Sequence, residues 1–345
     1  RDVLGVKSVG VNDDFFELGG DSIRAARLFV ELEQRCGIDR PISLLAEAPT
    51  VASLAIALER ASDSDWSSLL AVQTDGTRPP LFVIHDGMGS VYYARGLIGE
   101  LGPDQPIYGI RCEGLNGQPL QAGSLAELAT GYIEQIRALY PHGPYVLYGA
   151  SLGGVIAVEM ARQLAAAGED VPLVAIGDST APTAFRPPRG TGERAAARFA
   201  ELRTMSFTTR LSHIAWLTKR QIAARIRRAS KELRTAHREE QMLNRALEHG
   251  EPIPAAVRGR YVLRDYGRLL IDHRPEPPFP ERLLLLRTGG EGANPDRGWY
   301  ALVGDALEIV DVPGTHNDLG REASGGYIGP VLARALDRLP LITAV

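Results

Sequence analysis

The sequence predicts a small all-helical domain followed by an α/β domain with a mainly parallel sheet. Residues 1–60 show helix-like apolar spacing and no strand pattern. From about residue 68, short apolar runs alternate with helical stretches, and such alternation is typical of parallel strands covered by helices on both faces. A chain of 345 residues is long enough for both domains.

The helical domain is predicted from two patterns. Apolar residues at helical spacing run from about Ser22 to Arg35, and Gly37 fits a helix stop. A second helix is expected to begin after Thr50, whose hydroxyl suits the N-cap position. Residues 61–67, ASDSDWS, are polar and indicate a linker between the two domains.

The α/β domain, residues 68–345, is expected to contain strands in apolar runs that end near glycine or a polar residue. These runs are 81–85, 106–110, 145–149, 172–178, 282–290 and 307–314. Helical patterns lie between them at about 91–101, 124–139 and 152–167, and a last helix is expected from about Tyr327.

An Arg-rich, helix-like insertion at about residues 184–260 interrupts this alternation. It holds 17 Lys and Arg against 7 Asp and Glu, although the whole chain has a net charge of −4. One interpretation is a solvated set of amphipathic helices. The other is a basic surface that attracts residues 1–60, which hold 7 Lys and Arg against 10 Asp and Glu.

The overall composition argues against several classes of protein. A net charge of −4 gives no general attraction to nucleic acid. Cys36 and Cys112 lie in segments of different character and predict no disulfide framework, so a cytoplasmic location is expected. No apolar run reaches the roughly 18 residues that span a bilayer, and the start at Arg1 lacks the order of a signal peptide. We therefore expect no nucleic-acid or membrane partner.

The stretch GASLGG, residues 149–154, carries the strongest chemical signal of the α/β domain. It contains G-x-S-x-G between a predicted strand and a predicted helix, the context in which this motif presents a nucleophilic serine. Gly149 and Gly153 relieve the clashes of a strained turn. Ser151 is the predicted nucleophile, and the backbone N–H of Leu152 is placed to donate to an oxyanion.

A serine nucleophile needs a base, which in this kind of fold follows the serine and the acid along the chain. His316 is the predicted base because it lies in a loop directly after the apolar run 307–314. His273 precedes a Pro-rich turn and is expected to be structural. The other downstream histidines are in the insertion, where surface roles are expected: His213, His237 and His249.

The acid should end a strand that follows the nucleophile. Asp178 does so and would hold the tautomer of His316, although it also suits the cap of the next turn. Asp311 and Asp318 are alternatives because they are close to His316 in sequence. A second oxyanion donor is expected from the loop HDGMGS, residues 85–90, with Gly87 and Met88 as the two candidates.

Ser22 lies in the stretch DDFFELGGDSIRAARL. This stretch resembles the attachment site of peptidyl carrier proteins over residues 1–60, and the resemblance implies a 4′-phosphopantetheine group on Ser22. A phosphodiester at a helix N-terminus meets free N–H groups and the positive end of the helix dipole. The simpler interpretation makes Ser22 an N-cap only. The family's first helix is mostly missing, so we expect an N-terminally truncated carrier domain.

Residues 68–345 resemble the type I thioesterase that ends nonribosomal peptide synthetases, an α/β-hydrolase. The resemblance implies a catalytic triad of Ser151, Asp178 and His316, oxyanion donors at Leu152 and Gly87, and a helical lid in the insertion. The sequence departs from the family at two positions: Asp86 replaces a frequent proline, and Ala150 replaces a frequent aromatic residue or histidine.

Together these resemblances imply chain release in nonribosomal peptide synthesis: transfer of a peptidyl thioester to Ser151, then hydrolysis or macrocyclisation. The implied partners are upstream synthetase modules, a phosphopantetheinyl transferase and coenzyme A, and no metal site is predicted. Two alternatives are an editing thioesterase that clears misprimed carriers and a non-catalytic docking module. The fused carrier argues against the first, and an intact triad argues against the second.

Overall fold

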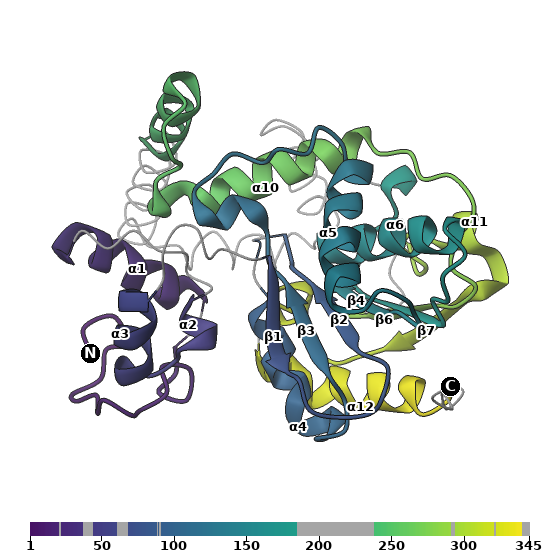
Figure 1. Ribbon diagram of the computed structural model, residues 1–345, viewed down its shortest axis with the longest axis horizontal. Helices are drawn as coiled ribbons and strands as arrows, with labels where there is room; N and C mark the ends of the chain where they lie inside the picture. The colour runs from purple at the N-terminus through teal and green to yellow at the C-terminus, as the bar shows by residue number, and fades with distance from the viewer. Residues whose placement is uncertain are drawn as a thin grey trace, which may run out of the picture. The chain divides into compact units, whose positions relative to one another are not determined.

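The computed structural model describes residues 1–20, 22–36, 44–60, 68–87, 89, 91–184, 238–290, 294–320 and 322–339 (Figure 1). The chain divides into two compact units, of which one comprises Arg1–Ala184 with Pro252–Val345 and the other Phe185–Glu251. Most of the second unit, including most of the predicted insertion, lies outside the described residues. Within that unit, residues 238–249 are helical.

The two helices predicted in the N-terminal part form as α1 (Ser22–Cys36) and α3 (Val51–Arg60), and a short helix that was not predicted separately, α2 (Leu44–Glu47), lies between them in the chain. The predicted cap of the last helix is confirmed, because Thr50 Oγ1 accepts a hydrogen bond of 3.1 Å from the backbone N–H of Ser53. A compact apolar core joins the helices to the segment before them, and it consists of Phe15, Ala25, Phe29, Leu44, Leu45, Ala48 and Leu54. Gly37, the predicted stop, lies outside the described residues.

The α/β part is built on a seven-stranded sheet with the order β1-β3-β2-β4-β5-β6-β7. Its strands are β1 (Leu69–Gln73), β2 (Leu81–Ile84), β3 (Ile107–Ile110), β4 (Val146–Ala150), β5 (Leu173–Gly177), β6 (Leu283–Arg287) and β7 (Leu307–Asp311). All neighbours from β3 to β7 are parallel, and β1 pairs antiparallel with β3. The predicted mainly parallel sheet is confirmed.

The edge strand β1 was not among the predicted strands. Its sequence LLAVQ directly follows the linker, and its side chains are half-buried or exposed because β1 lies at the edge of the sheet. The central strands are fully buried, which is why they stand out as continuous apolar runs. A short, half-exposed edge strand lacks that signal.

Helices cover both faces of the sheet (Figure 1). On one face lie α5 (Leu125–Leu139) and α6 (Leu152–Ala166), and on the other lie α4 (Ile98–Leu101) and α12 (Gly325–Leu336). The helix predicted at 91–101 begins as a 3₁₀ turn, η2 (Tyr92–Leu97), before α4. The long helix α10 (Ala255–Asp272) begins inside the range predicted for the insertion, about 184–260, and extends beyond it.

The remaining elements are single turns: η3 (Glu113–Asn116), η4 (Pro182–Ala184), α11 (Tyr300–Val303), η5 (Gly304–Ala306), η6 (His316–Asp318) and η7 (Glu322–Ser324). They connect the longer elements of the α/β part. In the part of the chain that the structure describes, no helix has the length and apolar character needed to cross a membrane.

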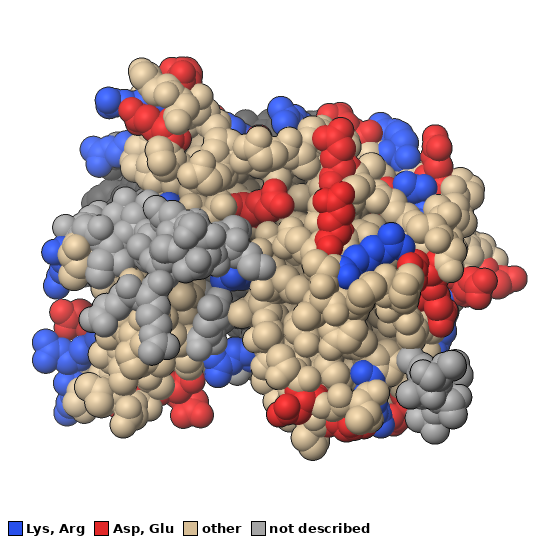
Figure 2. All heavy atoms as spheres, viewed as in Figure 1, with Lys and Arg blue, Asp and Glu red and all other residues tan. Residues whose placement is uncertain are grey.

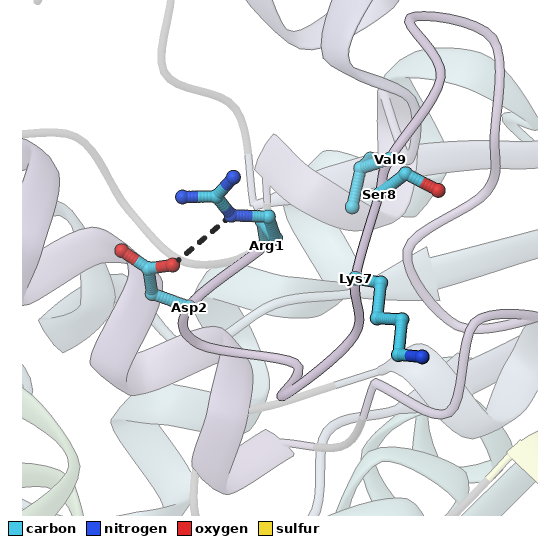
Figure 3. Close-up of a pocket in the computed structure, with 5 residues that line it drawn as sticks. All are labelled: Arg1, Asp2, Lys7, Ser8 and Val9. Atoms are coloured by element: carbon cyan, nitrogen blue, oxygen red, sulfur yellow. Dashed lines mark hydrogen bonds and ion pairs between the residues drawn. The ribbon is translucent and has the colours of Figure 1, made fainter.

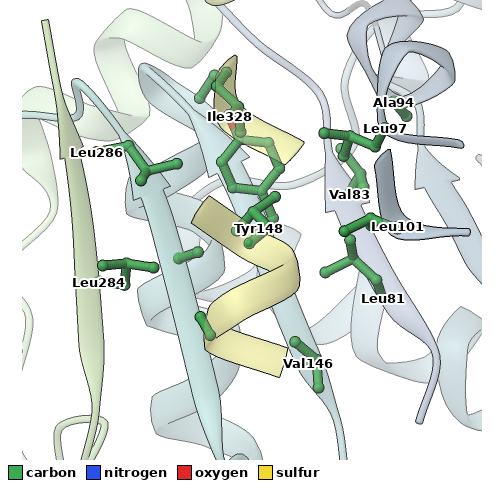
Figure 4. Close-up of a cluster of buried hydrophobic side chains, with 14 of the residues drawn as sticks. Leu81, Val83, Ala94, Leu97, Leu101, Val146, Tyr148, Leu284, Leu286 and Ile328 are labelled. Carbon is green, nitrogen blue, oxygen red and sulfur yellow. The ribbon is translucent and has the colours of Figure 1, made fainter. Parts of the chain in front are cut away.

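One large apolar core lies between the sheet and α12 (Figure 4). Alternate residues of a strand face the same side of a sheet, and in β4 the side chains of Val146 and Tyr148 both point into this core. Ile328 of α12 is completely buried against them. The core fixes the carboxyl ends of the strands, where the candidate site lies.

On the face drawn in Figure 2, basic and acidic side chains of the described residues are interspersed.

Candidate active site

Ser151 occupies a sharp turn between the end of β4 and the start of α6. Its φ of 54° and ψ of −120° lie where residues with a side chain are strained. Two backbone hydrogen bonds hold the turn: Ser151 N–H donates to the carbonyl of Gly177 at 2.7 Å, and Gly154 N–H donates to the carbonyl of Ser151 at 3.1 Å. The strain is therefore maintained by the neighbouring strand and by the first turn of α6.

Close backbone approach around this turn requires glycine. A Cβ on Gly149 would lie 2.2 Å from the carbonyl carbon of Gly153, and a Cβ on Gly153 would lie 2.3 Å from the carbonyl oxygen of His85. The nearest atom to a Cβ on Gly154 would be Ser179 Cβ at 2.6 Å. Each distance is shorter than a van der Waals contact, so α6 reaches its position over the sheet only without these side chains.

We expect Gly149→Ala to destabilise the protein strongly, because its new methyl group meets backbone that cannot rotate away. The matched control is Gly131→Ala in α5, where an added Cβ meets nothing within 4 Å. That change should stabilise the helix by roughly 0.5–1 kcal/mol. Thermal unfolding of both variants checks the pair. Equal melting temperatures would contradict the close approach at the turn.

The structure brings Asp178 and His316 together. Asp178 directly follows β5, and its carboxylate Oδ2 lies 3.2 Å from His316 Nδ1. A carboxylate only accepts hydrogen bonds, so Nδ1 of His316 carries the proton and Nε2 is left as the basic nitrogen. The Asp178 side chain is 4% exposed and that of His316 is 51% exposed, so the acid is buried beneath an accessible imidazole.

Two further side chains hold the Asp178 carboxylate. Thr288 donates its hydroxyl to Oδ2 at 2.6 Å and its N–H to Oδ1 at 3.2 Å, and Arg297 donates to Oδ1 at 2.7 Å. Burial raises the pKa of Asp178, but the hydrogen bonds from His316, Thr288 and Arg297 outweigh burial and hold that pKa well below its ordinary value. Asp178 is therefore ionised at any working pH.

The two alternative acids are engaged elsewhere. Asp311 forms a bidentate ion pair with Arg287, with contacts of 2.6 and 2.8 Å. Asp318 closes a capping box with Thr315, accepting from its N–H at 2.8 Å and from its hydroxyl at 2.7 Å. Of the three candidate acids, Asp178 is the one in hydrogen-bond contact with His316.

Sheet register places Ser151 beside Asp178. Ala150 of β4 is paired with Gly177 of β5, so the next residue of each strand, Ser151 and Asp178, lies at the same edge of the sheet. Among the contacts of the described residues, none joins the Ser151 hydroxyl to His316. Hydrogen bonds between nucleophile and base are often loose without substrate and tighten when it binds.

Two of the other histidines that follow Ser151 in the chain have different partners. His273, expected to be structural, follows α10 and lies with Nε2 3.5 Å from the buried carboxylate of Glu159. His249 is exposed and has Nδ1 2.8 Å from the carbonyl of Arg245. The two remaining histidines of the insertion lie outside the described residues: His213 and His237.

The two candidate N–H donors to the oxyanion lie at the start of α6 and in the loop after β2. Leu152 is the first residue of α6, so its N–H has no partner within the helix. Gly87 follows β2, whose Ile84 is paired with Gly149 of β4, so this loop starts beside the Ser151 turn. The alternative donor, Met88, lies outside the described residues.

Ser22 is the first residue of the 15-residue helix α1. Gly19 has φ +87° with open space where a Cβ would be, while a Cβ on Gly20 would collide with Phe15. Arg24, in the first turn, is exposed and donates to the carbonyl of Gly19. A helix N-terminus with a nearby guanidinium suits a phosphodiester, so the backbone here fits a phosphopantetheine group.

Sequence reasoning missed Thr288 and Arg297. Thr288 directly follows β6, so its place at a strand end was an available signal. Arg297 has no local motif and reaches Asp178 only through the fold.

A separate cavity of about 470 Å³ is lined by none of the candidate site residues. It lies in the N-terminal segment, against Arg1, Asp2, Lys7, Ser8 and Val9 (Figure 3).

Two families match the chain. The thioesterase domain matches residues 79–323, and the phosphopantetheine attachment site matches residues 1–58. CymA of Salinispora arenicola, described as a probable non-canonical nonribosomal peptide synthetase, is 31% identical over 97% of the chain. Malpibaldin synthetase of Mortierella alpina is 44% identical over 52% of it. The chain spans 4% and 3% of the lengths of these proteins.

Two solved structures are similar to the chain. A four-domain nonribosomal peptide synthetase, crystallised with AMP and glycine, is 26% identical over 98% of this chain, with a TM-score of 0.56, and 25% of that protein is covered. The NocB thioesterase domain, in covalent complex with a fluorophosphonate nocardicin G analogue, is 25% identical over 79% of this chain, with a TM-score of 0.54 and 99% of that domain covered.

Proposed function

We propose that this protein releases a peptidyl product in nonribosomal peptide synthesis. The chain belongs to the thioesterase family, and it joins a phosphopantetheine attachment domain to a thioesterase domain. The proposed boundaries are residues 1–60 for the carrier, 61–67 for the linker and 68–345 for the thioesterase, with a lid at about 184–260. The observation that carries the chemistry is the contact between Asp178 and His316, at the sheet edge that also carries Ser151.

In the first half-reaction, His316 Nε2 takes the proton of the Ser151 hydroxyl as Ser151 Oγ attacks the thioester carbonyl. The N–H groups of Leu152 and Gly87 stabilise the oxyanion. The carbon–sulfur bond breaks, His316 returns the proton to the leaving sulfur, and Ser151 is acylated. Ser22 would hold the 4′-phosphopantetheine, which supplies the thiol that carries the acyl chain as a thioester.

In the second half-reaction, His316 removes a proton from the incoming nucleophile, which attacks the ester on Ser151. The ester bond breaks, and Ser151 Oγ regains its proton from His316. Water as nucleophile gives a free acid, whereas an amine or hydroxyl of the bound chain gives a ring. Asp178 stabilises the imidazolium in both halves, and its ionised state suits that role.

The carrier in the same chain supports release in preference to editing, because the thioester is delivered by a covalently linked domain. The matching relatives are synthetases, and the match to the four-domain synthetase covers 98% of this chain, so it includes both the carrier part and the thioesterase part. We infer that the partners are upstream synthetase modules, together with the phosphopantetheinyl transferase and coenzyme A that modify Ser22.

The experiment loads the full chain, by means of a phosphopantetheinyl transferase, with a synthetic peptidyl-coenzyme A that ends in an amine. We expect one label per chain on Ser22, followed by release of the peptide. Mass spectrometry of the product identifies the outcome, since a ring is one water lighter than the free acid.

The control is Ser22→Ala, which should remain unlabelled but still cleave an N-acetylcysteamine thioester of the same peptide at the wild-type rate. Labelling of a different residue would refute the role of Ser22. A loaded chain that keeps its peptide, with soluble thioester also uncleaved, would refute release.

A further inference from the structure

His85 is the first residue of the proposed oxyanion loop, and its side chain is completely buried. Its Nδ1 lies 2.8 Å from the carbonyl oxygen of the next residue, Asp86. The same oxygen accepts a hydrogen bond of 3.0 Å from Gly89 N–H. Both lone pairs of the Asp86 carbonyl are thus occupied, and its direction is fixed.

A chain of buried hydroxyl groups fixes the state of the His85 ring. Because Nδ1 faces a carbonyl, Nδ1 carries the proton. Burial lowers the pKa of His85 to about 4, so the ring is neutral and Nε2 is an acceptor. Nε2 lies 3.0 Å from the Tyr132 hydroxyl, which lies 3.0 Å from that of Tyr266 on α10. Tyr132 therefore donates to His85 and accepts from Tyr266.

The direction of the Asp86 carbonyl determines the direction of the Gly87 N–H. These two groups belong to one planar trans peptide unit, in which C=O and N–H point in opposite directions. The carbonyl points to the His85 ring and to Gly89, so the Gly87 N–H points away from that ring. Gly87 is half-buried, and among the described residues the atom nearest to an added Cβ would be Leu263 Cδ1, at an ordinary van der Waals distance of 3.9 Å.

His85 also connects the proposed oxyanion loop to the turn that carries Ser151. The carbonyl oxygen of His85 is the atom nearest to a Cβ built on Gly153, at 2.3 Å, so the backbone at His85 packs directly on the start of α6. A small rotation of the Asp86–Gly87 peptide would therefore move one oxyanion donor relative to the other, Leu152 N–H, which is fixed by α6.

We propose that His85 is a positioning residue for catalysis: its Nδ1–H holds the Asp86–Gly87 peptide so that the Gly87 N–H serves the oxyanion. This inference rests on the proposed function of Ser151 and selects Gly87 over Met88 as the second donor. Tyr132 and Tyr266 complete the device by keeping the proton on Nδ1. Since Tyr266 belongs to α10, the oxyanion loop is connected to the helix that begins in the last part of the predicted insertion.

Two substitutions separate this role from simple core packing. His85→Asn places an amide N–H near the position of Nδ1 but is smaller, whereas His85→Leu fills the space without a donor. A packing role predicts that leucine is the better replacement. The positioning role predicts the reverse, because only asparagine can hold the Asp86 carbonyl.

The assay measures kcat and KM of the full chain on an N-acetylcysteamine peptidyl thioester. Removal of one oxyanion donor costs about 10²- to 10³-fold in kcat. For a misplaced donor we expect about 30- to 100-fold for His85→Leu, with KM within about twofold, and at most about fivefold for His85→Asn. Melting temperatures show which variants are folded. If leucine matches or exceeds asparagine in kcat, the proposal is wrong.

A third variant keeps the test decisive if a His85 variant does not fold. Tyr132→Phe preserves the ring and removes the donor to Nε2, and we expect about a three- to tenfold fall in kcat with unchanged KM. An unchanged kcat would overturn the proposal. Labelling of Ser151 by a fluorophosphonate is measured in parallel on the wild-type chain; failure there refutes the proposed nucleophile, which separates the two hypotheses.

Discussion

Replacing Ser151 with alanine is expected to abolish thioester cleavage, with kcat lowered by about 10³- to 10⁶-fold. The variant loses the proposed acceptor of the acyl group, Ser151 Oγ, while its backbone stays compatible with the turn between β4 and α6. On the loaded full chain, the peptide should therefore stay attached to the carrier, and intact mass spectrometry measures this directly. His316→Ala should lower kcat by a similar factor.

The double variant should be hardly worse than either single variant, because nucleophile and base act as one unit. Ser124→Ala provides a matched serine control. The hydroxyl of Ser124 caps α5 by accepting from Glu127 N–H at 3.1 Å, so its loss should cost about 1 kcal/mol of stability and leave kcat unchanged. Residual release by Ser151→Ala above about a tenth of the wild-type rate would show that another group is acylated.

Asp178→Asn is expected to lower kcat by about 10³- to 10⁴-fold with little change in size or fold. The carboxylate accepts the Nδ1 proton of His316, whereas an amide can present N–H in its place and stabilise the wrong tautomer. It also cannot stabilise the imidazolium by charge. Measurement of kcat on a soluble thioester is sufficient, because binding of the substrate should be unaffected.

The chain offers two matched controls for this change, Asp311→Asn and Asp318→Asn. Their carboxylates bind Arg287 and Thr315, whereas the carboxylate of Asp178 is hydrogen-bonded to His316. We expect each to keep kcat within about fivefold of wild type and to lose stability instead. A loss of activity in either control equal to that of Asp178→Asn would reassign the acid.

The pH dependence of stability tests the charge state of Asp178. Its pKa is held below the ordinary value in the folded chain. The ionised carboxylate therefore adds stability above the unfolded pKa of about 3.9, and this is lost as the pH falls through the folded pKa. The difference in melting temperature between wild type and Asp178→Asn should not shrink as the pH falls from 8 to 5, because the carboxylate also favours the charged form of His316, and it should shrink below about pH 4. A difference that already shrinks near pH 6 would contradict this assignment.

The sequence identified the central strands and the nucleophile turn because their signals are local. Buried parallel strands produce continuous apolar runs, and G-x-S-x-G between a strand and a helix depends on residues adjacent in the chain. Chain order and strand ends then directed attention to Asp178 and His316. Sequence proximity, however, left Asp311 and Asp318 as alternatives, and only the contacts of Arg287 and Thr315 separate them.

What the sequence alone determined is the set of reactive groups and the elements on which they lie: the serine turn, a later acid, a later histidine, and a second serine at the start of α1. The tertiary structure decided which groups meet, as in the contacts of Asp178 with Arg297 and of His85 with Tyr132. These contacts join residues 119 and 47 positions apart. Local patterns depend on a few consecutive residues, whereas such contacts depend on the packing of the whole sheet, so no short stretch of sequence records them.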